Sequence, residues 1–151
     1  MTVDRAIQHI PFDLGFGRDI EPAGRLRLSY KNDWGDWSAE RDEWGWITDK
    51  LTAEFGLGAD FSEFVRIEFE GPMIFQVPDE TWESLASDST RWIGDLTTFA
   101  REVIGHEYAA LNSLFFSLNG GGKHYQFVTG EACLDVIARS EPRASMHRGE
   151  V

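Results

Sequence analysis

The sequence predicts an α+β fold, in which one antiparallel sheet of four to six strands packs against three or four helices. Three observations predict it. Several short segments alternate polar and apolar residues, as half-buried strands do. Glycine-containing links between some of them favour antiparallel hairpins over the long crossovers of a parallel sheet. Longer segments repeat apolar residues every three or four positions, which is typical of helices.

The 151 residues are expected to form a single compact domain over residues 1–139, followed by a polar tail over residues 140–151. Hydrophobic residues make up 42% of the chain and aromatic residues 13%, which is enough for an ordinary core. No internal repeat or low-complexity linker divides the chain, so a second domain is not expected.

The strand pattern occurs in six segments. Residues 25–30 (RLRLSY) alternate most regularly, whereas residues 6–12 form a weaker strand that Pro11 assigns to a sheet edge. The other four segments pair as two hairpins, each around a turn sequence. The hairpins join 64–69 (FVRIEF) to 73–77 (MIFQV) across Glu70-Gly71-Pro72, and 113–118 (SLFFSL) to 124–129 (HYQFVT) across Asn119–Lys123.

The helical pattern occurs in four segments. The clearest of them repeats Trp92, Leu96, Phe99 and Val103, and Gly105 is expected to end it. Apolar positions spaced by three or four residues, capping residues or glycine stops identify the others. The expected helices run over about 38–55, 79–85, 92–104 and 131–138.

The negative charge of the chain is concentrated in its middle. The formal net charge is −12, and residues 32–88 hold 15 acidic residues but only three basic ones, Arg41, Lys50 and Arg66. The rest of the chain holds 11 acidic and 11 basic residues. A local imbalance of this kind creates a directed field that attracts a basic protein partner. Direct binding of nucleic acid is not expected, because phosphate contacts need clustered lysine and arginine.

A cytoplasmic location is expected, without insertion into a membrane. The one cysteine, Cys133, cannot form an internal disulfide, which suits a reducing compartment. The N-terminal residues lack the basic and apolar regions of a signal peptide, and no apolar run approaches the ~20 residues of a membrane span. Motifs for a metal or a nucleotide cofactor do not occur, so neither is expected.

Residues 32–46 (NDWGDWSAERDEWGW) hold four of the six tryptophans, interleaved with five carboxylates and Arg41. On the expected helix, Trp37 and Trp44 share a buried face, whereas Trp46 lies about 200° around the axis from Trp44. Carboxylates would steer a basic partner toward this surface, and an exposed tryptophan would anchor it. The predicted partner-binding residues are Asp33, Trp34, Asp36, Glu40, Asp42, Glu43 and Trp46.

These properties predict a small acidic binding module that inhibits a basic, nucleic-acid-handling protein. Immunity proteins, antitoxins and phage inhibitors of defence enzymes share this physical character, and the analogy is one of charge alone. The carboxylates would occupy the sites where the partner binds phosphate. A structural or assembly subunit that forms a homodimer through exposed tryptophans is a second interpretation.

A small hydrolase or transferase is the third interpretation, although a non-enzyme is favoured because no catalytic motif occurs. His124, with Glu131 and Asp135 nearby in the sequence, is the best candidate for acid–base catalysis. The more ordinary expectations are that His124 faces solvent on a strand and that Cys133 packs as a small hydrophobic residue. Tryptophans beside carboxylates are also typical of sites that act on sugars.

Overall fold

The structure, a computed structural model, describes residues 7–17, 20–22, 26–32, 35–39, 44–57, 62–77, 92–94, 98–105, 122–129 and 133–148. In these residues the regular structure consists of strands alone. The strands are β1 (Ile7–Pro11), β2 (Leu26–Asn32), β3 (Gly35–Ala39), β4 (Trp44–Gly56), β5 (Glu63–Gln76), β6 (Trp92–Gly94), β7 (Ala100–Ile104), β8 (Lys123–Val128), β9 (Cys133–Ala138) and β10 (Arg143–Arg148).

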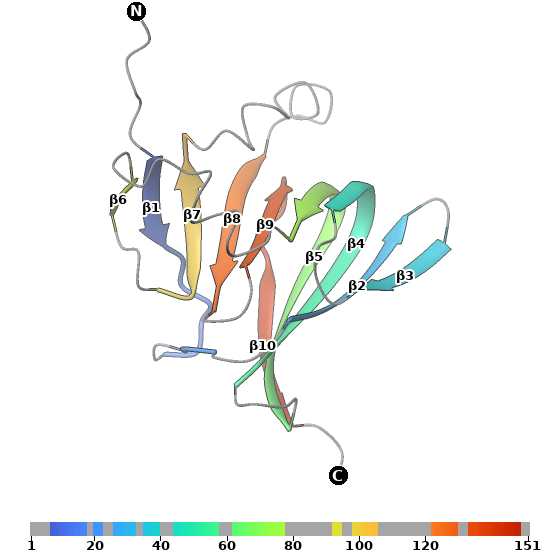
Figure 1. The fold of residues 1–151 in the computed structure, drawn as a ribbon, viewed down its shortest axis with the longest axis horizontal. Coiled ribbons are helices and arrows are strands. Elements are labelled where there is room, and N and C mark those ends of the chain that lie inside the picture. Colours follow the sequence, from blue (N-terminus) through green and yellow to red (C-terminus); the bar gives the residue numbers. More distant parts are fainter. Residues whose placement is uncertain are drawn as a thin grey trace, which may run out of the picture.

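These strands form one sheet with the order β3-β2-β4-β5-β9-β8-β7-β1-β6, and β10 also pairs with β5 (Figure 1). The pairings between them are antiparallel except for the parallel pairing of β1 with β6. The long strand β5 has two partners along one edge, because residues 63–68 pair with β10 and residues 73–76 pair with β9. Its other edge is bordered by β4.

The predicted α+β fold is wrong, because the described part of the chain contains no helix. The segments expected to be helical at 38–55, 92–104 and 131–138 instead contribute to β3, β4, β6, β7 and β9. The expected helix at 79–85 and the expected strand at 113–118 lie outside the described residues. The strands expected at 25–30 and 124–129 are confirmed as β2 and β8.

β1 is present as expected, but it is not an edge strand. It pairs with β7 on one side and with β6 on the other. Only residues 7–9 pair with β6, so Pro11 lies beyond that pairing. The missing N–H of the proline therefore interrupts no bond to β6.

Irregular pairing explains why β4 resembles a helix in the sequence. The register between β4 and β5 shifts between Gly45 and Thr48, and again between Thr48 and Lys50. Such a shift adds a residue to an alternating strand and produces apolar spacings of three. Beyond the shifts the alternation is regular, with buried side chains at Leu51, Ala53 and Phe55.

Burial on both faces explains why β7 and β9 resemble helices in the sequence. All six residues of β9 are buried, and β7 buries Arg101 as well as its neighbour Ala100. A strand that is buried on both faces does not need to alternate polar and apolar residues. Its sequence then cannot be distinguished from a short buried helix by periodicity.

The hairpin expected around Gly71 is also wrong, because β5 continues through this position as a single strand. Gly71 has a φ of +95°, a left-handed conformation that favours glycine. Residues 139–142, which separate β9 from β10, lie opposite this position in the register. The glycine therefore bends β5 where it changes partners. Residues 140–151, interpreted from the sequence as a polar tail, include β10.

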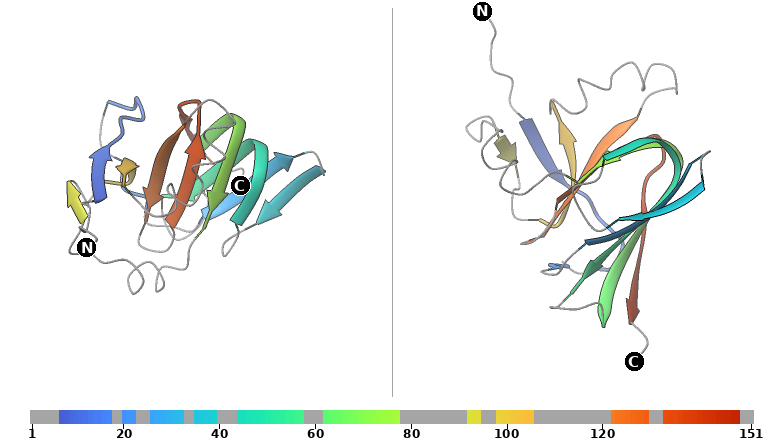
Figure 2. Two further views of the ribbon diagram at one scale, coloured as in Figure 1. Left: turned by 90° about the horizontal axis from the view of Figure 1, so that it is seen from above. Right: turned by 45° about the vertical axis from the view of Figure 1, so that its right-hand side comes forward.

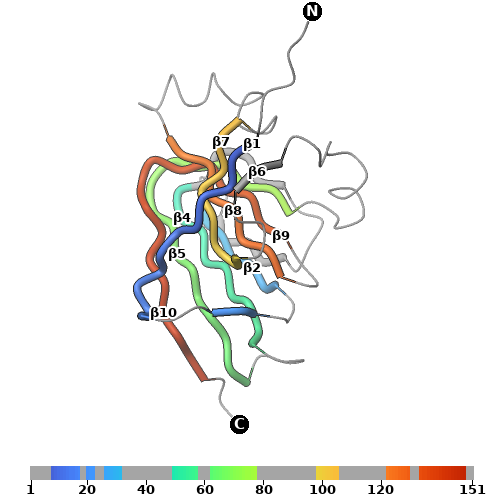
Figure 3. Tube along the Cα trace, turned by 90° about the vertical axis from the view of Figure 1, so that its left-hand side faces the viewer, coloured from blue at the N-terminus to red at the C-terminus, as the bar shows by residue number. Residues whose placement is uncertain are grey.

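The sheet curls, so strands that are distant in its order face each other across the core (Figures 2 and 3). β4 lies three places from β8 in the strand order, yet the ring centroids of Phe55 and Phe127 are only 6.1 Å apart. Three strand spacings in a flat sheet would separate them by about 14 Å. The ring centroid of Phe99, just before β7, is 4.9 Å from that of Phe55. The inner face thus closes around an aromatic core that includes Phe55, Phe69, Phe75, Tyr125 and Phe127.

The outer face, which points away from this core, differs between the two halves of the sheet. On β2, β4 and the first part of β5 most of its side chains are polar and at least partly exposed, as at Arg27 and Arg66, whereas Phe64 is apolar and buried. On β7, β8 and β9 its polar side chains are buried, as at Arg101, His124 and Asp135. In the part of the chain that is described, no helix has the length and apolarity needed to cross a membrane.

Candidate functional site

Of the seven predicted partner-binding residues, only Asp36 in β3 and Trp46 in β4 lie in the described strands. The other five lie outside the described residues: Asp33, Trp34, Glu40, Asp42 and Glu43. The helical geometry used to separate Trp44 from Trp46 does not apply, because both residues belong to β4. The two predicted partner-binding residues that the structure describes therefore both belong to strands.

Residues 32–46 are called the acidic tryptophan segment below. Strand register brings the two ends of this segment toward the same end of the sheet. Asp36 in β3 is opposite Lys31 in β2, and Lys31 is opposite Lys50 in β4. Trp46 precedes Lys50 by four residues along β4. Asn32 is the last residue of β2, and residues 44–46 belong to the part of β4 that extends past this end of β2. The acidic tryptophan segment therefore starts and finishes toward the same end of β2.

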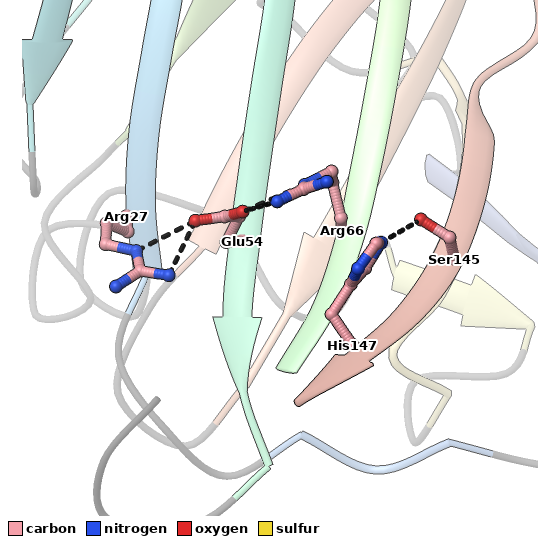
Figure 4. A network of polar contacts seen from close by, with 5 residues as sticks. All are labelled: Arg27, Glu54, Arg66, Ser145 and His147. Carbon is pink, nitrogen blue, oxygen red and sulfur yellow. Dashed lines mark hydrogen bonds and ion pairs between the residues drawn. The ribbon is translucent and has the colours of Figure 1, made fainter. Parts of the chain in front are cut away.

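Residues 32–88, the acidic block, also contain carboxylates that arginines of the same chain neutralise, and Figure 4 shows one of them, Glu54. Glu54 on β4 lies between Arg27 on β2 and Arg66 on β5. Its Oε1 is 2.7 Å from Nη2 of Arg27, and its Oε2 is 2.8 Å from Nη2 of Arg66. Nε of Arg27 donates to Oε1 and Nε of Arg66 donates to Oε2, each at 2.9 Å. Each carboxylate oxygen thus accepts a charge-assisted hydrogen bond from Nε of one guanidinium and forms an ion pair with Nη2 of the same group.

β10 supplies further arginines to the acids of β5. Nη2 of Arg143 is 3.1 Å from Oε1 of Glu70 and 3.7 Å from Oε2 of Glu68. Nε of Arg148 is 3.9 Å from Oε1 of Glu63. These pairs are exposed, and each contributes little to stability on its own. Their main effect is on the surface field, because arginines from outside residues 32–88 offset part of the charge of that block.

Phe64 forms a platform beneath this network. The guanidinium carbons of Arg27 and Arg66 lie 5.2 Å and 5.6 Å from the centroid of its ring. The ring of His147 stacks on Phe64 at 5.3 Å with an interplanar angle of 13°. Oγ of Ser145 is 2.7 Å from Nε2 of His147 (Figure 4). Cation–π and stacking contacts of this kind hold side chains in place on an exposed sheet face.

The buried half of the outer face contains a polar cluster centred on Asp135, which is fully buried in β9. Gln76 on β5 and Gln126 on β8 are its direct neighbours in the register. Nε2 of Gln76 donates to Oδ2 at 3.0 Å, and Nε2 of Gln126 donates to Oδ1 at 3.0 Å. Nε2 of His124, in a diagonal position on β8, lies 2.7 Å from Oδ1. Three strands therefore meet at one carboxylate.

The pairing of His124 with Asp135 has the geometry of an oriented imidazole. An ionised carboxylate only accepts hydrogen bonds, so Nε2 of His124 donates to it. The side chains of the two residues are 1% and 0% exposed. A catalytic base must come within hydrogen-bonding distance of its substrate. In this conformation the pair instead joins β8 to β9.

The expectation that His124 faces solvent is wrong, because the residue is 3% exposed. Of the two acids near it in the sequence, Asp135 is its partner, and Glu131 lies outside the described residues. The expectation that Cys133 is packed in the interior is confirmed by its burial. Among the described residues, no group of three or more histidine, cysteine, aspartate or glutamate side chains is placed to hold a metal ion.

Sequence reasoning missed Gln76 and Gln126 as members of this cluster. His124 and Gln126 alternate with the core residues Tyr125 and Phe127, which is the pattern of a polar strand face. Asp135 is the one charged residue of β9, within an otherwise apolar and small segment. A lone carboxylate in such a strand needs partners if it is buried, and amides on neighbouring strands can supply them.

Tyr125 faces the inner core on the same strand. Its ring packs edge-on against Phe12, at 5.3 Å between centroids, and lies 5.7 Å from Phe69. Within the described structure its buried hydroxyl has no hydrogen-bond partner. Burial, followed by the carboxylates of Glu141 and Glu102, raises the pKa of Tyr125 from 10.0 to about 12. The hydroxyl without a partner indicates a cost to the fold at neutral pH, and the raised pKa indicates that its ionised form is disfavoured in the folded state.

We expect Tyr125→Phe to raise the free energy of unfolding at neutral pH by about 1 kcal/mol, because it removes an unsatisfied buried hydroxyl. In the wild type, the folded state resists ionisation of Tyr125, so this ionisation does not affect stability below pH 10.0 and lowers the free energy of unfolding as pH rises toward about 12. Over that range the wild type should lose about 2–3 kcal/mol more stability than the variant. Urea unfolding across this pH range measures both effects. A variant that is less stable at neutral pH would contradict the expectation.

No protein-family model, no curated protein and no solved structure matches this chain. Charge, strand register and side-chain contacts are therefore the basis on which we propose a function.

Proposed function

We propose that this chain is an acidic binding module that inhibits a basic, nucleic-acid-handling protein in the cytoplasm. The distribution of charge supports this proposal most directly. Residues 32–46 combine five carboxylates with one arginine, whereas Glu54, Glu68 and Glu70 further along the acidic block lie against arginines of the same chain. The proposed partner surface is therefore residues 33–46, with Asp33, Trp34, Asp36, Glu40, Asp42, Glu43 and Trp46 as its contacts.

In the proposed mechanism, carboxylates of residues 33–46 occupy the positions where the partner binds phosphate oxygens. Their field accelerates encounter with the basic surface. The tryptophans supply apolar area that holds the complex together once it has formed. The buried, reduced Cys133 is compatible with a cytoplasmic site of action.

Capture of the partner from an extract of the cells that encode this chain tests the proposal. Immobilised protein should retain a basic protein at low salt and release it at high salt, because the attraction is between charges that salt screens. Excess DNA or RNA should also release it, since nucleic acid and the inhibitor compete for one surface. The nucleic-acid-dependent activity of the released protein should fall when the chain is added back.

A captured protein that binds nucleic acid and this chain at the same time would contradict the proposal. So would capture that is insensitive to salt. A second arm with Asp42→Lys/Glu43→Lys as the immobilised protein identifies the surface, because this variant should retain much less of the partner.

A further inference from the structure

β3 ends the strand order, and within the described residues it pairs with β2 only (Figure 1). It runs antiparallel to β2 over its whole length, from Gly35 opposite Asn32 to Ala39 opposite Leu28. An edge strand of this kind presents a row of backbone N–H and C=O groups on its outer side. Such a row is a template for one more strand.

The other strands with a single partner in the described sheet are poorer templates. β6 has three residues, and strands this short offer few hydrogen bonds. β10 begins with Arg143 and ends with Arg148, and charged side chains on an edge discourage pairing with a second strand. β3 (GDWSA) contains no proline, and its one charged residue is Asp36, which would attract rather than repel a basic strand. Of these strands, β3 is therefore the most open to pairing.

The charge around β3 selects the kind of strand that it can accept. Residues 32–46, which contain β3, hold five carboxylates and one arginine. Pairing with β3 of a second copy would bring two such segments together, and their like charges would repel. A lysine- or arginine-rich segment would instead be attracted to the same edge.

We propose that β3 binds an extended basic segment of the partner as an additional antiparallel or parallel strand of the sheet. This inference rests on the proposed function and specifies how the partner is held. Backbone hydrogen bonds along β3 would contribute affinity that does not depend on sequence, and the acidic side chains would select basic residues. The partner would thus bury its basic segment in the sheet edge, where nucleic acid cannot reach it.

A peptide of alternating lysine and valine is the probe for this inference. Its binding should slow hydrogen exchange of the backbone amides of residues 35–39, which become paired on the outer side of β3. The control peptide has the same sequence with N-methyl groups on alternate amides, so it keeps the charge but cannot form the ladder. We expect the affinity of this control peptide to be at least about tenfold lower than that of the unmethylated peptide.

Two variants with the same change in net charge complete the experiment. Asp42→Lys/Glu43→Lys should weaken binding of the unmethylated peptide, whereas Glu21→Lys/Glu141→Lys, at exposed positions outside the acidic block, should leave it nearly unchanged. Failure of the peptide to bind overturns the inference. Equal binding of the methylated peptide, or protection at strands other than β3, does so as well. Protection of residues 35–39 that grows with the concentration of the chain alone would assign the edge to a second copy.

The outcomes separate this inference from the proposed function. A captured partner that nucleic acid displaces, but that leaves residues 35–39 unprotected, preserves the proposed function and overturns strand addition. If the extract yields no partner that nucleic acid displaces, the proposed function fails, whatever the peptide does.

Discussion

Substitution of Asp135 with asparagine is expected to lower the free energy of unfolding by about 2–4 kcal/mol. The carboxylate of Asp135 is fully buried and accepts hydrogen bonds from Gln76, Gln126 and His124. Asparagine has nearly the same shape, but it replaces one acceptor oxygen with an NH2 donor. At least one of the three donors would then face another donor in a site that excludes water. Chemical unfolding of the two proteins in urea measures the difference.

Glu70→Gln is the matched control for Asp135→Asn. It makes the same chemical change on a neighbouring strand, but the side chain of Glu70 is 61% exposed and contacts Arg143 on the surface. Glu70→Gln should change the free energy of unfolding by no more than about 0.5 kcal/mol, because water can replace the interactions that the exposed carboxylate makes. Equal effects of the two substitutions would show that the Asp135 cluster does not hold β5, β8 and β9 together.

Reversal of charge at Asp42 and Glu43 should slow association with the captured partner about 10-fold to 100-fold at low salt. Steering acts on the encounter of the two proteins, so the dissociation rate should change by less than about threefold. Adding the reversals Asp33→Lys and Asp36→Lys should enlarge the effect on association. Stopped-flow or surface-binding kinetics at several salt concentrations separate the two rates.

The control for this experiment is Glu21→Lys/Glu141→Lys, which changes the net charge by the same amount at residues outside the block. The association rate of this control should stay within about twofold of the wild-type rate. Steering depends on where the charges lie, and it falls off over a Debye length of about 8 Å. If the control slows association as much as the test variant, only the total charge matters. Association that does not depend on salt would contradict electrostatic steering altogether.

Part of the sheet is predictable from local pattern. Residues 25–30 and 124–129 alternate polar and apolar side chains, and both segments are strands. Prediction fails in β4, where irregular register changes the apolar spacing, and in β9, where burial on both faces removes the alternation. In both strands the local spacing resembles a helix, and only pairing with neighbouring strands distinguishes the two.

The candidate site, like the sheet, is only partly predictable from the sequence. The acidic tryptophan segment is visible in the sequence, because charge and composition are local properties. The neutralisation of Glu54 by Arg27 and Arg66 is not visible, because these residues come together only through the pairing of β2, β4 and β5. The same holds for Gln76, which is 59 residues from Asp135.

Three properties can be identified without a structure: the concentration of acid in residues 32–88, the single cysteine and the material for a large aromatic core. Three others are visible only in the folded chain: the curled sheet that encloses this core, the place of β3 at an edge of the described strands, and the burial of His124 against Asp135. The physical reason is that charge and composition add up along the chain. Strand pairing and burial depend on partners that are far away in the sequence.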